Sequence, residues 1–308
     1  MNKKCLLLFF NNEEDEIMKA INEYDTLNAE CVFIPINFFL RVIRKIHIKS
    51  NLPGISIWLG KWKHDISQYD QVICIASMYS YRILKWVKKA NKKIRVINYF
   101  WDSIAISNYK IKRIKSIENW SFDQNDSTRY GLKYNPQFYV RQKLESNKKC
   151  LYDVVYVGSD RNGILKNRRK ILSELYELLS GMDCKCKFCL LTKSNDINPE
   201  IKISQPIKSD QYNKIVSQGK VLLDIVEEGN EWMTLRPLLA LSNKKKVITN
   251  NIYIKKEKYY LKDDIFILGE DDKDSIKQFI DSPFTVIPSD NMEYYECAEW
   301  IKRFDIGD

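Results

Sequence analysis

Short, continuous apolar runs alternate with helix-like segments along this chain, and the alternation occurs twice. In the first half, the apolar runs 4–10, 71–76 and 94–100 are separated by segments of helical periodicity. The same pattern restarts at residue 152. Strands that are apolar throughout are buried on both faces, which is typical of a parallel sheet covered by helices. The sequence therefore predicts two doubly wound α/β domains.

The expected elements and domain limits follow from this pattern. The expected strands are 4–10, 31–36, 71–76, 94–100, two short ones near Trp120 and Phe138, and then 152–157, 186–191, 221–226, 246–249 and 265–268. The expected helices are 13–24, 38–48, 79–89, 165–179, 210–217, 235–241, 275–280 and 292–303. The polar, lysine-rich stretch 141–149 is the best linker. We expect an N-terminal domain 1–145, a C-terminal domain 150–290, and a final helix in 291–308 that crosses back to the first domain.

Composition narrows the function classes. The 308 residues include eight cysteines, most of them inside apolar runs, and the first residues do not resemble a signal peptide. We therefore expect free thiols in a reducing cytosol. No stretch approaches the roughly 18 apolar residues of a membrane span. The net charge of +10 favours a phosphate-rich partner, although a generally lysine-rich composition explains it equally well.

The first candidate site is the segment YDVVYVGSDRNG at 152–163. A buried strand runs into Gly158 and Ser159, and a helix begins a few residues later. Glycine lets the backbone approach a phosphate, and the serine hydroxyl and helix N-terminus can donate to it. Arg161 and Lys166 add positive charge. The alternative is an ordinary turn that connects a strand to a helix and binds no ligand.

The second candidate site is the segment LLDIVEEGNEWMTLRPLLAL at 222–241. A strand is followed by Glu227, Glu228 and Gly229, and a helix opens at Thr234 with Arg236 in its first turn. Such a helix start can hold a diphosphate leaving group, and the carboxylates can hold sugar hydroxyls. The alternative is a helix cap with a surface ion pair.

A third candidate lies in NYFWDSIAI at 98–106, where Asp102 follows a strand of the first domain. A carboxylate there can orient or deprotonate an acceptor hydroxyl. The alternative is an aspartate that caps the next segment.

These segments together resemble bacterial lipopolysaccharide and capsule biosynthesis proteins, the CgeB-like glycosyltransferases of the GT-B fold. The similarity covers NYFWDS, WSFDQNDSTRYGLKYNPQFY, YDVVYVGSDRNGILKNR, LLDIVEEGNEWMTLRPLLALSNKKKVITNN and IFILGEDD in this order. The resemblance implies two Rossmann-like domains that face a central cleft. It also implies a nucleotide-sugar donor bound mainly by the second domain and an acceptor bound mainly by the first.

The chain departs from this family at one position. The family commonly has Arg-Pro-x-Glu-Ala at the start of the last conserved helix, and the glutamate holds the donor ribose. Here the matching residue is Leu239, which cannot accept a hydrogen bond. Either Glu228 or Glu231 substitutes for it, or donor binding differs, or the protein has lost activity.

Several metal-like patterns are better explained as structural. Cys184, Cys186 and Cys189 lack a fourth ligand and lie on an expected strand. The DKD segment at 272–274 is more simply an acidic helix start. The two histidines lie far from the acidic segments, so we expect neither a metal site nor Ser-His-Asp catalysis.

The segment 38–49 combines apolar residues with four lysines and arginines, and Trp58 and Trp62 follow it. Such a helix either packs on the sheet or lies on an anionic membrane.

The sequence analysis thus predicts a glycosyltransferase that moves a sugar from a nucleotide-diphosphate donor to a lipopolysaccharide or capsule glycan, free or lipid-linked. The donor is a co-substrate, and no metal or other cofactor is expected. The expected location is the cytoplasm, with or without peripheral contact with the inner face of the plasma membrane. The alternatives are an inactive glycan- or nucleotide-binding relative and a nucleic-acid-binding protein. The latter lacks any known nucleic-acid module.

Overall fold

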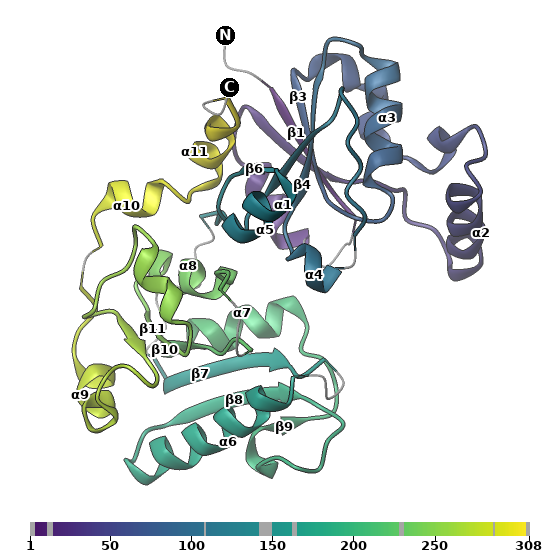
Figure 1. Ribbon diagram of the computed structural model, residues 1–308. Helices are drawn as coiled ribbons and strands as arrows, with labels where there is room; N and C mark the ends of the chain where they lie inside the picture. The colour runs from purple at the N-terminus through teal and green to yellow at the C-terminus, as the bar shows by residue number, and fades with distance from the viewer. Residues whose placement is uncertain are drawn as a thin grey trace. The chain divides into compact units, whose positions relative to one another are not determined.

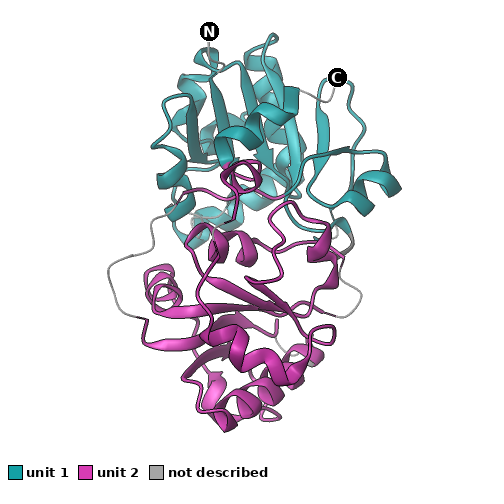
Figure 2. Cartoon of the chain, turned by 90° about the vertical axis from the view of Figure 1, so that its left-hand side faces the viewer, with its two compact units in different colours: residues 1–136, 297–308 teal, residues 137–296 magenta. Residues whose placement is uncertain are grey.

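Two six-stranded parallel sheets organise the chain, one in each of two units. The computed structural model describes residues 4–10, 15–107, 109–141, 150–161, 165–227, 231–285 and 287–305. Unit 1 comprises residues 1–136 and 297–308, and unit 2 comprises residues 137–296 (Figure 2).

The sheet of unit 1 has the strand order β2-β1-β3-β4-β5-β6, and every pairing is parallel. Its strands are β1 (Cys5–Phe9), β2 (Leu27–Cys31), β3 (Gln71–Ile75), β4 (Arg95–Phe100), β5 (Glu118–Ser121) and β6 (Lys133–Tyr134). Its helices are α1 (Asp15–Ile21), α2 (Phe38–Lys49), α3 (Ser80–Ala90), α4 (Ile104–Ser107), α5 (Gln124–Tyr130) and α11 (Cys297–Lys302), with the 3-10 turns η2 (Ile55–Trp58), η3 (Lys61–His64), η4 (Ile66–Gln68) and η8 (Arg303–Asp305).

Both faces of this sheet are covered, which explains its continuous apolar strands. Val96 in β4 belongs to the same buried cluster as Leu84 of α3. Tyr99, three residues further along β4, points to the other face, where its ring lies 4.9 Å from that of Trp300 in α11. A sheet buried on both sides needs apolar residues at consecutive positions.

The sheet of unit 2 has the order β12-β11-β10-β7-β8-β9, again with parallel pairings throughout. Its strands are β7 (Tyr152–Ser159), β8 (Cys186–Leu191), β9 (Lys202–Ile203), β10 (Gly219–Asp224), β11 (Lys246–Thr249) and β12 (Ile265–Ile267). Its helices are α6 (Lys166–Gly181), α7 (Ser209–Ser217), α8 (Leu235–Ser242), α9 (Ile276–Asp281) and α10 (Ser289–Glu293), with the 3-10 turns η5 (Pro199–Ile201), η6 (Ile252–Lys256) and η7 (Lys273–Ser275).

Helices α6 and α8 lie on opposite sides of this sheet (Figure 1). Val154 and Tyr156 of β7 belong to a buried cluster with Leu172 of α6. The intervening Val155 belongs to a second cluster with Leu238 of α8. The two parallel sheets, each flanked by helices, confirm the predicted α/β architecture.

Two expected elements are wrong in their limits. Residues 31–36 are not a strand, because β2 ends at Cys31 and Phe33 forms only an isolated antiparallel bridge with Leu59. The expected helix 292–303 is two helices, since the carbonyl of Tyr295 accepts the backbone N–H of Tyr139 at 2.8 Å and leaves the helical pattern.

Residues 137–141 belong to unit 2 through the same pairing, in which Tyr139 forms a parallel bridge with Glu296. No strand forms at Phe138. The return to unit 1 starts at Cys297 and carries α11 and η8.

Candidate functional site

The carboxyl ends of β7 and β10 mark the topological switch point of the unit 2 sheet. From β7 the chain continues to β8 and β9 on one side, and β10, β11 and β12 lie on the other. In open parallel sheets, ligands bind in the crevice beyond the carboxyl ends of the strands at such a point. The loops after β7, β10 and β11 are therefore the best candidates for a ligand-binding or catalytic site.

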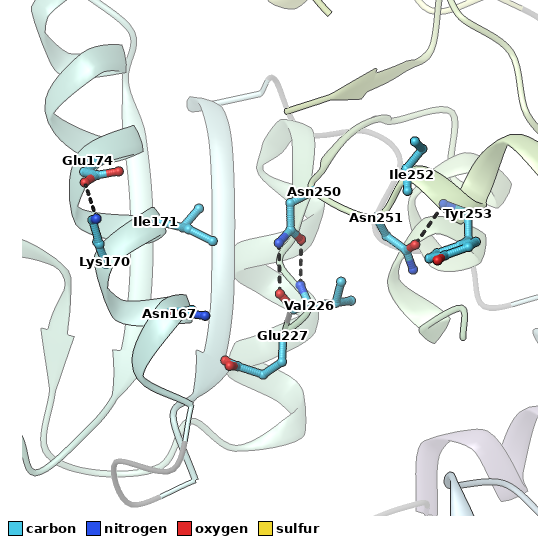
Figure 3. Close-up of a pocket in the computed structure, with 10 residues that line it drawn as sticks. All are labelled: Asn167, Lys170, Ile171, Glu174, Val226, Glu227, Asn250, Asn251, Ile252 and Tyr253. Carbon is cyan, nitrogen blue, oxygen red and sulfur yellow. Dashed lines mark hydrogen bonds and ion pairs between the residues drawn. The ribbon is translucent and has the colours of Figure 1, made fainter. Parts of the chain in front are cut away.

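A cavity of about 440 Å³ lies at this edge, between α6 and the loops after β10 and β11 (Figure 3). Ligand pockets typically have volumes of roughly 300–1,000 Å³. The lining residues come from α6, from the start of the loop after β10, from the loop after β11 and from the start of η6. They are Asn167, Lys170, Ile171, Glu174, Val226, Glu227, Asn250, Asn251, Ile252 and Tyr253.

Glu227 contributes the acidic group of the β10 loop to this cavity, and Figure 3 shows its carboxylate directed toward the start of α6. Its Oε1 atom is buried and has no hydrogen-bond partner among the described residues. A buried oxygen without a partner costs free energy, about 1–3 kcal/mol and more for a charged group. A ligand hydroxyl that donates a hydrogen bond to this oxygen would remove that cost.

Two asparagines after β11 fix the segments around the cavity. The side-chain amide of Asn250 donates to the carbonyl of Val226 (2.9 Å) and accepts from its backbone N–H (2.8 Å). Asn251 donates to the carbonyl of Trp232 (2.9 Å). These contacts hold both flanks of the segment 228–230. The predicted residues Glu228 and Gly229 are in that segment, outside the described residues.

Asn250 and Asn251 are functional candidates that sequence patterns alone do not identify. Their signal was present in the sequence, as two amides directly after an apolar run. Nothing local, however, relates them to residues 24 positions earlier.

The predicted Gly158 and Ser159 form the last two residues of β7. A Cβ atom at Gly158 would clash with the hydroxyl of the buried Tyr156, so a larger residue here would force this tyrosine to move. The Ser159 hydroxyl accepts the backbone N–H of Arg161 at 3.0 Å. Arg161 is exposed and has a left-handed backbone, with φ of 52°.

The N-terminus of helix α6, which is the positive end of the helix dipole, also has lysine and arginine side chains in its first turns. No side chain caps it at Leu165, and its first turn contains no acidic residue. Arg168 donates to the carbonyl of Ser159 (2.8 Å), and Arg169 pairs with the buried Asp160 (2.8 Å). The predicted Lys166 opens the helix, and its side chain lies outside the described atoms. Helix N-termini favour anions, so this edge of the sheet suits a phosphate.

Thr234 and Arg236 at the start of α8 form an internal polar cluster. Thr234 is the N-cap, accepting the backbone N–H of Arg236 (3.2 Å) and donating to Asp224 (2.8 Å). The Arg236 guanidinium bonds to Asp224 (3.3 Å) and to the carbonyl of Val157 (3.2 Å), and its centre lies 5.3 Å from the ring centroid of Tyr156.

Burial works against the charge of Arg236, but the Tyr156 and Asp224 side chains more than offset it and hold its pKa above the ordinary value. The side chain is 22% exposed. Arg236 therefore ties α8 to β7 and β10 while keeping a solvent-accessible part.

Leu239 packs against the apolar cluster of unit 2 that contains Leu238 and Ile254. Glu231 is exposed, and its carboxylate raises the pKa of the Tyr253 hydroxyl at the cavity.

In unit 1, Asp102 is exposed just after β4. The N–H of Ile104, which opens α4, donates to Asp126 (2.8 Å). The pKa of the Tyr109 hydroxyl is raised mainly by burial and also by the negative charge of Asp102.

The described residues contain no cluster of three or more side chains that could hold a metal ion. All eight cysteines are free thiols. In the DKD segment, Asp272 accepts the N–H of Asp274 at 3.1 Å, which is the contact of a helix cap.

No family model and no curated protein matches this sequence. Among solved structures, the chain is similar to HepE from Anabaena in complex with UDP-glucose, with a TM-score of 0.52 and 9% identity over 99% of this chain and 98% of that one. A glycosyltransferase from Rickettsia africae (TM-score 0.44, 12% identity, 99% and 98% covered) and MurG from Acinetobacter baumannii (TM-score 0.34, 10% identity, 82% and 79% covered) are less similar. The HepE likeness spans nearly the whole chain and confirms the predicted fold: this protein has the GT-B architecture of two Rossmann-like units.

Proposed function

We propose that this protein is a glycosyltransferase that takes a nucleotide-diphosphate sugar as donor. The observation that carries the proposal is Glu227, an acid in a cavity at the switch point of unit 2 whose buried Oε1 atom has no hydrogen-bond partner among the described residues. HepE, which has the same fold, was solved with UDP-glucose.

The donor diphosphate would lie near the start of α6, where Arg168 accompanies the positive helix end. The negative charge of the diphosphate grows as the glycosidic bond breaks, so fixed positive groups there favour the transition state over the ground state. Ser159, Arg161, Lys166, Thr234 and the accessible part of Arg236 remain proposed contacts, as does Gly229. We keep the expectation that no metal is required.

Glu227 would accept hydrogen bonds from donor hydroxyls, on the ribose or on the sugar. A carboxylate can accept two such bonds side by side. This role would replace the glutamate that the resemblance places at position 239, where the leucine is packed against the core. Glu228 remains a proposed sugar contact.

The acceptor would be a glycan of the lipopolysaccharide or capsule type, used on the cytoplasmic side of the membrane. Asp102 in unit 1 is the proposed acceptor contact. It would serve as general base if the reaction inverts configuration.

The leucine at position 239, where the resemblance places a glutamate, motivates an alternative. In this alternative the protein is an inactive relative that still binds a nucleotide or glycan. Donor binding without any release of the nucleotide diphosphate in the presence of acceptors would favour this alternative.

The test is a thermal-shift series with UDP-glucose and other nucleotide sugars. A donor at a hundredfold its Kd stabilises the folded protein by about 2.7 kcal/mol. We expect Glu227→Gln to weaken donor binding about tenfold or more, since hydrogen bonds to charged groups contribute roughly 1.5–3 kcal/mol. The melting temperature of this variant without ligand should equal or exceed that of the wild type, because the substitution removes the negative charge of a carboxylate whose buried Oε1 atom has no partner among the described residues.

Glu200→Gln is the matched control, because Glu200 is exposed on η5 and does not line the cavity. If no nucleotide sugar stabilises the wild type, the proposal is wrong. If donors bind equally well to Glu227→Gln, the donor site lies elsewhere.

A further inference from the structure

Helix α2 of unit 1 exposes its apolar side chains. Phe38 is 81% exposed, Phe39 71% and Ile46 58%, and Ile48 is the only buried residue of the helix. Monomeric soluble proteins rarely leave a contiguous set of large apolar side chains in water. The surface therefore requires an explanation of its own.

The exposed residues form one face of the helix. Phe38, Val42 and Ile46 recur every four positions, and Phe39 and Ile43 form the adjacent row. We call these five residues the α2 face. All five are exposed. The expectation of an ordinary amphipathic helix that packs its apolar side on the sheet is therefore wrong for α2 within unit 1.

The segment that contains the α2 face has charged side chains of one sign. Residues 31–64 contain six lysines and arginines, both histidines of the chain, and no aspartate or glutamate. Lys45 and Lys49 border the row of Phe38 on the helix surface. More than half of the net charge of +10 thus belongs to one short segment of unit 1.

Helix α2 is held firmly in this orientation. The Asn37 side chain caps its N-terminus by accepting the N–H of Leu40 (2.9 Å). At its other end, Arg82 of α3 donates to the carbonyl of Ile48 (2.6 Å) and to the Asn51 side chain (2.9 Å). The outward display of the apolar face is thus a fixed feature of unit 1.

The two tryptophans expected at a membrane surface serve a different purpose. Trp58 is 9% exposed and donates to His47 of α2 at 3.1 Å, and Trp62 is fully buried. Both rings are buried in the core of unit 1, so the membrane alternative does not extend to these tryptophans. Leu52 and Ile57, in the same segment, are exposed instead.

We infer that the α2 face docks unit 1 onto the surface of an anionic lipid bilayer. Apolar side chains would enter the boundary between headgroups and acyl chains while the flanking lysines meet lipid phosphates. The absence of any acid from residues 31–64 favours a negatively charged surface over a protein of mixed charge. Among the described residues, no helix is long and apolar enough to cross a membrane. This inference stands independently of the proposed function.

The test is co-sedimentation with vesicles, using the full-length protein. We expect binding to phosphatidylcholine vesicles that contain about one third phosphatidylglycerol, and little binding to phosphatidylcholine alone. Phe38→Ser/Phe39→Ser should reduce binding about tenfold or more, because the apolar contribution is lost. Lys45→Glu/Lys49→Glu should reduce it by a similar factor, with a smaller remaining dependence on salt.

Two control variants match these changes elsewhere. Leu151→Ser removes an exposed apolar side chain of unit 2, and Lys92→Glu/Lys93→Glu reverses two exposed charges after α3. Both should leave vesicle binding within about twofold of the wild type.

Unchanged binding by the phenylalanine variant would overturn the inference, since attraction would then be purely electrostatic. A second set of results would also overturn the inference. The wild type would be a dimer in sedimentation equilibrium, the phenylalanine variant would be a monomer, and neither would bind vesicles. In that case the α2 face is a contact between copies of this chain.

Discussion

Asp224 in unit 2 has a buried carboxylate, which is 2% exposed. Thr234 and Arg236 both donate to its Oδ1 atom. A buried carboxylate is tolerated when it is paired and hydrogen-bonded, and removing one partner leaves an uncompensated charge.

At the residue scale, we therefore expect Arg236→Ala to lower the free energy of unfolding by about 3 kcal/mol. Urea denaturation monitored by circular dichroism measures this change. Arg161→Ala, at an exposed arginine with no side-chain contact described, should change stability by about 0.5 kcal/mol or less. Equal stability of the two variants would contradict a structural role for Arg236.

This expectation also affects the choice of variants for ligand binding. A loss of donor binding in Arg236→Ala would mix a lost phosphate contact with a disturbed junction between α8, β7 and β10. Glu227→Gln separates ligand binding from stability better, because the buried Oε1 atom of Glu227 accepts no hydrogen bond from any described residue.

At the element scale, the C-terminal segment α11–η8 is joined to the sheet of unit 1 through Arg95. This arginine donates to both carboxylate oxygens of Glu118 (2.6 and 2.7 Å), to Asp305 (2.8 Å) and to the carbonyl of Phe304 (2.8 Å). Trp300 and Phe304 add ring contacts with Tyr99 and Trp120.

This junction gives a prediction for the pH dependence of stability. Partial burial would raise the pKa of Glu118, but hydrogen bonds from Arg95 and Trp120 outweigh it and lower the pKa below the ordinary 4.5. A depressed carboxyl pKa stabilises the folded state at pH values above 4.5, and this contribution is lost as the pH falls through the folded-state pKa.

We expect the melting temperature of the wild type to fall more steeply between about pH 5 and pH 3 than that of Glu118→Gln, which has no charge to lose. Thermal melts across this pH range measure the difference. Glu174→Gln, at an exposed pair with a 3.9 Å separation from Lys170, is the control and should follow the wild type. Parallel curves for wild type and Glu118→Gln would exclude the proposed linkage.

At the scale of the whole molecule, each unit has its own buried core and its own buried thiols. Cys5 and Cys74 are in unit 1, and Cys184 and Cys189 are in unit 2. Burial raises the pKa of each of these thiols, to about 12 for Cys5, where the Gln71 side chain only partly opposes it. Such thiols react with alkylating reagents only when the surrounding structure opens.

If the donor site lies wholly in unit 2, UDP-glucose should slow labelling of Cys184 and Cys189 and leave the labelling of Cys5 and Cys74 unchanged. At a hundredfold the Kd, the slowing should be about a hundredfold. Mass spectrometry of alkylated peptides measures each site, and the exposed Cys150 should react at the same rate throughout. Equal protection in both units would show that they open together or share the ligand.

The parallel α/β architecture could be predicted from the amino-acid sequence, because strands buried on both faces need consecutive apolar residues, and such runs are visible without knowing their partners. The sequence also predicts local features such as the helix start at Thr234, whose side chain bonds to an N–H only two residues away.

The residues that share a site, and the face that is left open, follow from the folded arrangement of the chain and not from any local pattern. Glu227 lines a cavity with Asn250 because β10 and β11 are adjacent in the sheet, and the C-terminal return after Glu296 likewise depends on contacts between distant residues. Trp62 is buried while Phe38 is exposed, although both lie in the same basic, apolar segment. Residue type fixes how much a side chain gains from leaving water, whereas competition for the limited space of the core decides which side chains leave it.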